Sequence, residues 1–186
     1  MLKSKMQEFS YDLLNESILN KSYLDKSFQV GIFKSKGNKI DVDGIESRWD
    51  EAMRQEYMKS VATGNAVTPL VIVDANECLK NADSEKDKDY FQTIITKGFR
   101  YIVVDGWNRV VTLLKFKKNL FKFPKTKKMF VLDNNDIEQF VEVSQPVDYK
   151  TLKSAETKDE LNLLNAIDNA KIYCIVVTKA TKKDIS

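Results

Sequence analysis

The stretch from residue 100 to residue 116 constrains the fold more than any other part of the chain. An apolar run over residues 101–104 ends at Asp105 and Gly106, and an apolar pattern of helical spacing begins after Arg109. This order predicts a buried strand, a tight turn and a helix that starts at a polar cluster. The junction between them is the first place to look for a binding site.

The chemistry of this junction is that of a phosphate site. The first backbone N–H groups of a helix point at one spot, where the helix macrodipole favours an anion. Gly106 has no Cβ, which lets a ligand approach the backbone, and Arg109 offers a planar fork suited to phosphate. The pattern predicts a phosphate pocket built from Asp105, Gly106, Asn108 and Arg109. The alternative is a purely structural turn, because Asp-Gly is a common turn signal and Asp a common helix cap.

Residues 105–113 read Asp-Gly-Trp-Asn-Arg-Val-Val-Thr-Leu. They resemble the Asp-Gly-Gln-Gln-Arg-x-x-Thr-Leu signature of the GmrSD-type restriction family, within the ParB/sulfiredoxin superfamily. The Asp, Gly, Arg, Thr and Leu are in register, and Trp107 and Asn108 replace the two glutamines. Asn108 keeps the amide group, whereas Trp107 is a departure because indole has one donor and no acceptor.

A second stretch extends the resemblance upstream. Arg48 and Trp49 precede a predicted helix over residues 50–62, and a proline and a predicted strand over residues 70–73 follow. Ser47-Arg48 stands where the family has a Gln-Arg pair, and the spacing from Arg to Trp is shorter. The resemblance covers roughly residues 38–116 well and residues 171–186 loosely.

The resemblance implies a ParB/sulfiredoxin-like domain that binds a nucleoside triphosphate, with Mg²⁺ brought by the nucleotide. Arg48 would be a second clamp beside Arg109, and Asp105 and Arg109 would serve slow phosphoryl transfer to water. The implied setting is conflict between phage and bacteria, in restriction of modified DNA or its counter-measure. The nuclease, if there is one, would be a separate subunit.

Each of these residues also has a structural alternative. Arg48 would pack its stem on Trp49, and Asp105 would cap the helix or hold Arg109 in place. Trp107 would either stack on a nucleobase or be a packed core anchor. Asn108 would either bond a phosphate or a base edge, or face water in the first helical turn.

A basic run offers a different function, binding of DNA. The run spans residues 115–128 and has seven lysines and no acidic residue, with Phe116, Phe121 and Phe123 interleaved. A basic run with aromatic residues is typical of a nucleic-acid surface. The alternative is a solvated loop whose phenylalanines pack on the core. The candidate nucleic-acid-binding residues are Lys115, Lys117, Lys118, Lys122, Lys125, Lys127 and Lys128. A third function is that of an interaction or decoy subunit which engages a defence protein.

Composition excludes several classes of enzyme. The chain has no histidine, so Ser-His-Asp catalysis, Cys-His catalysis and His-ligated metal sites are ruled out. No P-loop run occurs, and we predict no metal site formed by protein ligands alone. Cys78 and Cys174 are expected to be inert free thiols. The N-terminus lacks the apolar core of a signal peptide and no apolar run approaches the ~20 residues of a membrane span, so we expect a cytoplasmic protein.

Short strands alternate with helices along the chain, which predicts an α/β (α+β) class with a small mixed sheet and flanking helices. We expect an N-terminal helical extension over residues 1–37 and a nucleotide-binding domain over residues 38–186, either minimal or C-terminally truncated. The predicted helices span residues 6–24, 50–62, 108–118 and 157–170; the predicted strands span 39–42, 70–73, 101–104, 129–132 and 172–177. Residues 83–89 are expected to be a surface loop, and residues 137–143 are helical or extended.

Overall fold

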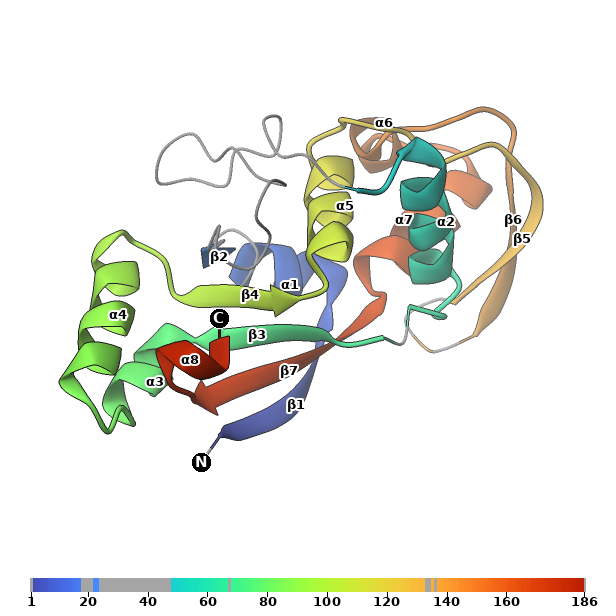
Figure 1. Cartoon of the computed structure of the whole chain (residues 1–186). Helices are drawn as coiled ribbons and strands as arrows, with labels where there is room; N and C mark the ends of the chain where they lie inside the picture. The colour runs from blue at the N-terminus through green and yellow to red at the C-terminus, as the bar shows by residue number, and fades with distance from the viewer. Residues whose placement is uncertain are drawn as a thin grey trace.

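The computed structural model describes residues 2–17, 22–23, 48–66, 68–132, 135 and 137–185. Its centre is a five-stranded mixed sheet of order β1-β7-β3-β4-β2 (Figure 1). Pairing is antiparallel between β1 and β7 and between β3 and β4, and parallel between β7 and β3 and between β4 and β2. The strands are β1 (Lys3–Ser10), β2 (Ser22–Tyr23), β3 (Leu70–Asp74), β4 (Tyr101–Asp105) and β7 (Lys171–Lys179). The predicted class, a small mixed sheet with flanking helices, is confirmed.

Both faces of this sheet are covered, because its central strands are apolar on both sides. Leu70 and Ile72 of β3 face the larger core, whereas Val73 faces the smaller one. The larger core includes α1 (Tyr11–Ser17), α2 (Glu51–Ala62), α5 (Trp107–Lys117), α6 (Tyr149–Lys153) and α7 (Lys158–Asp168). The smaller core includes α3 (Ala75–Lys80), α4 (Glu85–Thr96) and α8 (Lys182–Ile185), which gather at one end of the sheet in Figure 1.

A separate two-stranded hairpin of β5 (Thr126–Leu132) and β6 (Glu138–Val143) flanks the larger core, at the opposite end from α4 (Figure 1). Val131 and Val141 are buried on its inner side. The structure thus confirms the strand predicted over residues 129–132, and it settles residues 137–143, left open by the sequence, as a strand from residue 138.

The helices predicted at residues 50–62, 108–118 and 157–170 form within one to two residues of their expected bounds. Side-chain caps define two of them. Asp50 accepts a hydrogen bond from the N–H of Met53 at the start of α2, and Thr157 accepts one from Glu160 at the start of α7. The apolar spacing of α2 and α7 also favours Met53 and Leu161 as core residues, but these two side chains are 49% and 42% exposed.

The predicted helix over residues 6–24 is wrong for residues 6–10, which belong to β1, and for residues 22–23, which form β2. Strand β1 pairs with β7 along its whole length, and Phe9 lies opposite Ile172. The local pattern of residues favours a helix here and carries no information about β7, at the far end of the chain. Pairing with β7 overrode this local preference. The helix begins only at Tyr11. The boundary placed at residue 37 and the strand predicted over residues 39–42 lie outside the described residues.

The surface loop predicted over residues 83–89 is also wrong, because α4 begins at Glu85. Ser84 caps this helix by accepting a hydrogen bond from the N–H of Asp87. Lys88 and Glu85 form an ion pair with an Nζ–Oε1 distance of 2.6 Å, which supports the first turn. The charged run is therefore the solvated first turn of a helix whose Phe91 and Ile94 reach the smaller core.

Candidate functional site

The predicted strand, turn and helix at residues 100–116 form as expected. Strand β4 ends at Asp105, Gly106 follows with φ of +91°, and α5 begins at Trp107. Gly106 is the N-cap and provides no side-chain cap. A Cβ on Gly106 would lie 2.4 Å from Leu70 Cδ2 and 3.0 Å from Arg109 Nη2. Packing and a left-handed backbone, rather than access for a ligand, account for this glycine.

The guanidinium group of Arg109 is turned back into the protein. Its Nη1 donates to the backbone carbonyls of Thr68 and Pro69, and its Nη2 lies 3.2 Å from Asp105 Oδ2. The side chain is 12% exposed, whereas that of Asp105 is 70% exposed. Arg109 thus ties the start of α5 to the segment before β3. Asp105 pairs with it and does not cap the helix, so the structural role observed is the orienting one.

Arg48 and Asn108 come together although they lie sixty residues apart in the chain. The backbone N–H of Arg48 donates to Asn108 Oδ1 at 3.2 Å, which holds the segment before α2 against the start of α5. Arg48 is exposed and Asn108 is half-buried. The structure thus places the backbone of Arg48 beside the turn at residues 105–109, and the expectation that its side chain is a second clamp beside Arg109 stays a prediction.

The aromatic residues beside this site are packed rather than open. Trp107 is 4% exposed and belongs to the larger core, so the core-anchor alternative is correct and its ring offers no face to a nucleobase. Trp49 contacts Tyr57, with ring centroids 5.5 Å apart, and its carbonyl accepts from Arg54 Nη2 at 2.7 Å. These contacts fix the backbone that presents Arg48.

Three buried groups titrate far from neutral pH, and two of them, Tyr57 and Cys174, lie near Arg109. Burial raises the pKa of Tyr57 to about 12, although the positive charge of Arg109 opposes this shift. Burial also raises the pKa of the Cys174 thiol to about 12 and that of Cys78 to about 11. Both cysteines are buried and free, as the sequence predicted, and neither thiol is an available nucleophile at neutral pH. Sequence reasoning missed Tyr57 as a neighbour of Arg109.

The basic run divides into exposed and buried parts. Phe116, Phe121 and Phe123 are all buried, so the alternative in which they pack on the core is correct. Lys115 is half-buried, and the exposed lysines of the run are Lys118, Lys122, Lys125, Lys127 and Lys128.

Lys117 does not belong to that exposed surface. Its ammonium group pairs with Asp12, contacts the Tyr149 hydroxyl at 2.6 Å and lies 3.9 Å from Asp168 Oδ1. The hydrogen bond from Lys117 lowers the pKa of Asp12. The side chain of Lys117 is 18% exposed. We therefore correct its place in the basic surface: its ammonium group joins α1, α5, α6 and α7 and is not part of the exposed lysines.

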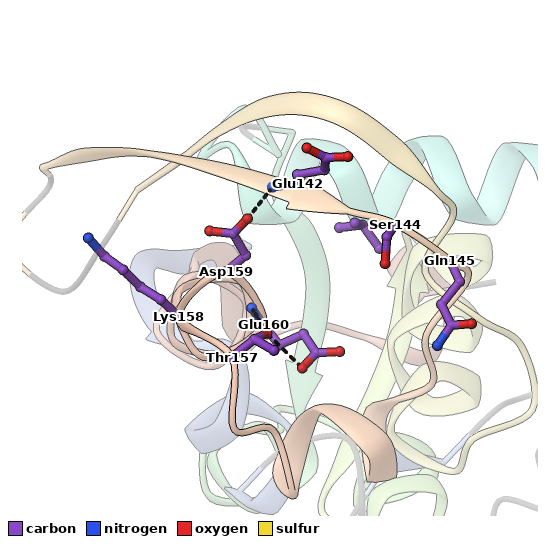
Figure 2. Close-up of a pocket in the computed structure, with 8 residues that line it drawn as sticks. Glu142, Ser144, Gln145, Thr157, Lys158, Asp159 and Glu160 are labelled. Atoms are coloured by element: carbon purple, nitrogen blue, oxygen red, sulfur yellow. Dashed lines mark hydrogen bonds between the residues drawn. The ribbon is translucent and has the colours of Figure 1, made fainter.

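A cavity of about 320 Å³ lies at the start of α7 (Figure 2). Its walls include Glu142, Asp159 and Glu160, and Lys158 extends away from these carboxylates (Figure 2). Asp159 Oδ2 accepts from the backbone N–H of Glu142 at 3.0 Å, and Thr157 Oγ1 donates to Glu160 Oε2 at 2.8 Å. Because Asp159 and Glu160 of α7 place carboxylates at this cavity, it disfavours phosphate, and it is not a candidate for the predicted ligand.

Within the described part of the chain, no group of three or more Cys, Asp or Glu side chains is placed to hold a metal ion. Magnesium brought by a nucleotide stays a prediction. No helix among the described residues is long and apolar enough to cross a membrane. The chain matches no model of a known protein family, no curated protein and no solved structure.

Proposed function

We propose that this chain binds the phosphate groups of a nucleoside triphosphate at the start of α5, with Arg48 as the main contacting side chain. The observation that supports this is the hydrogen bond from Arg48 N–H to Asn108 Oδ1. It holds Arg48, an exposed residue, beside a helix start whose N-cap, Gly106, makes no side-chain cap to the first N–H groups of α5.

The roles proposed for the two arginines differ. Arg109 donates hydrogen bonds to the Thr68 and Pro69 carbonyls and to Asp105, so we assign it to positioning the turn. Arg48 is exposed, and its planar fork suits a phosphate oxygen pair. Asp105 is exposed beside Arg109, where a carboxylate would accompany a nucleotide-bound Mg²⁺ ion.

Hydrolysis of the bound nucleotide is the second part of this proposal. It rests on the resemblance of residues 105–113 to the GmrSD-type signature, which also suggests a role in conflict between phage and bacteria. Asp105 would then help position Mg²⁺ or the attacking water, and any cutting of DNA would come from another chain.

Calorimetric titration with ATP, GTP and CTP, with and without Mg²⁺, tests the binding. We expect one nucleotide to bind, and Arg48→Ala to weaken it by about tenfold or more, since a charge-assisted contact contributes about 1.5–3 kcal/mol. Lys80→Ala, which removes a cation from α3 on the other side of the sheet, should leave the affinity unchanged. Absence of binding, or equal affinity in Arg48→Ala, would refute the proposal. Phosphate release in the same samples tests hydrolysis separately.

A second function, binding of a polyanion such as DNA, is supported by five exposed lysines between residues 118 and 128. Lysine contacts to phosphates release counterions, so the affinity should fall steeply with salt. The Lys125→Ala/Lys127→Ala/Lys128→Ala variant should bind a labelled duplex more weakly and with a shallower salt slope. Salt-independent binding, or no binding to any nucleic acid, would contradict this function.

A further inference from the structure

The outer face of the β5–β6 hairpin exposes two aromatic rings. Phe130 and Phe140 form a cross-strand pair with ring centroids 3.7 Å apart and an interplanar angle of 41°. They are 47% and 49% exposed, whereas Val131 and Val141 on the inner side are buried. The core therefore accounts for the inner face of the hairpin and leaves the aromatic pair on the outside without a packing role.

Positive charge lies beside these rings along one strand. Lys128 Nζ is 4.1 Å from the centroid of the Phe140 ring, and Lys125 and Lys127 are exposed just before it. On the other strand, Glu138 and Glu142 are exposed two residues to either side of Phe140, and thus share its face. The face has a basic edge at β5, an aromatic centre and an acidic edge at β6.

We propose that this face is a stacking platform for unpaired bases of a single-stranded nucleic acid, whose phosphates follow the lysines of β5. Aromatic rings stack on any base, and lysines neutralise the backbone without reading sequence. A base inside a duplex already stacks on its neighbours, so the rings select a single strand. The carboxylates of β6 keep the phosphates on the β5 side.

The inference rests on the polyanion binding proposed above and adds the kind of strand to it. It is independent of the nucleotide site, because its residues lie on and just before the β5–β6 hairpin and not at the start of α5. An apolar patch of this kind also suits a protein partner, but the run of exposed lysines beside the rings favours a polyanion.

The test compares two sets of substitutions by fluorescence anisotropy, using labelled oligo-dT of 20 nucleotides and a 20-base-pair duplex at two salt concentrations. Phe130→Leu/Phe140→Leu keeps an apolar surface and removes the rings. We expect it to weaken binding of the single strand by about tenfold or more, with duplex binding and the salt slope unchanged. Lys125→Ala/Lys127→Ala/Lys128→Ala should weaken binding of both. Met53→Ala, an equally exposed apolar residue on α2, is the matched control.

The other outcomes of this experiment overturn the stacking platform, and one of them also overturns polyanion binding. Unchanged single-strand binding in the leucine variant, or a wild-type preference for duplex, overturns the stacking platform and leaves polyanion binding in place. Binding of neither probe overturns both. Loss in Phe130→Ala/Phe140→Ala without loss in the leucine variant indicates that apolar contact, and not stacking on the rings, holds the strand, and overturns the proposal. Circular dichroism of each variant confirms the fold, and a Phe130→Trp variant should lose fluorescence when a base stacks on it.

Discussion

Two helices of this protein start in opposite ways. Helix α7 begins with Thr157, which accepts a hydrogen bond from the N–H of Glu160, and carboxylates surround that start. Helix α5 begins with Gly106, which has no side chain, and arginines lie beside it. A helix start that its own side chain caps and that carboxylates surround does not attract an anion. Although both helices carry a dipole of the same kind, only the start of α5 is therefore a candidate for an anion.

The largest expected effect tests the glycine at the start of α5. Gly106→Ala combines a left-handed backbone with a Cβ placed 2.4 Å from Leu70 Cδ2, so we expect a loss of about 2–5 kcal/mol in the free energy of unfolding. Urea denaturation measures it. Gly98→Ala is the control: Gly98 has φ of +84° but nothing within 4 Å of its Cβ position, so only strain of about 1 kcal/mol remains. Equal losses in the two variants would contradict the packing argument.

The next effect separates the two arginines of the α5 site. Arg109→Ala removes hydrogen bonds to the Thr68 and Pro69 carbonyls, and we expect it to lower the free energy of unfolding by about 2–3 kcal/mol. Arg48→Ala should lower it by less than about 0.5 kcal/mol, because the Arg48 side chain is exposed and its backbone N–H is kept. Thermal unfolding of both variants decides the matter. A larger loss in Arg48→Ala would reverse the assigned roles.

Alkaline pH should lower the free energy of unfolding through ionisation of Tyr57. Its folded pKa of about 12 lies above the ordinary value of 10.0, so its stabilising contribution is complete below pH 10 and is lost between pH 10 and pH 12. The loss is on the order of 2 kcal/mol. Tyr57→Phe should make the fall in unfolding free energy across this window shallower, measured by urea denaturation at several pH values. An identical pH profile would place the titration elsewhere.

The smallest effect concerns the capped start of α7. Thr157→Ala removes a side-chain cap, which should cost about 1 kcal/mol of unfolding free energy. Thr157→Ser, which keeps the hydroxyl, should cost much less. Neither change should alter nucleotide affinity if the ligand lies at α5. A change in affinity in either variant would indicate that the two helix starts are not independent.

Most elements could be predicted from the sequence, because local signals define them. The apolar run before Asp105, the glycine that follows it and the Thr157–Glu160 capping pair are all read within a few residues. The loop predicted over residues 83–89 failed for a local reason, because Ser84 caps a helix there. Two other features escaped the sequence because they depend on distant partners. Residues 6–10 became a strand because β7 lies beside them, and the Phe130–Phe140 pair depends on the register of a hairpin that the sequence did not resolve.

The sequence by itself determined where the α5 turn lies and that a glycine must occupy it, since backbone geometry and the end of an apolar run are local properties. Only the tertiary structure decided which arginine faces solvent. The guanidinium of Arg109 turns toward carbonyls some forty residues upstream, whereas Arg48 bonds Asn108 across sixty residues through its backbone N–H and is itself exposed. Such bonds depend on how β3 and β4 pair and on where α2 packs, because the direction of a long side chain follows the partners within its reach.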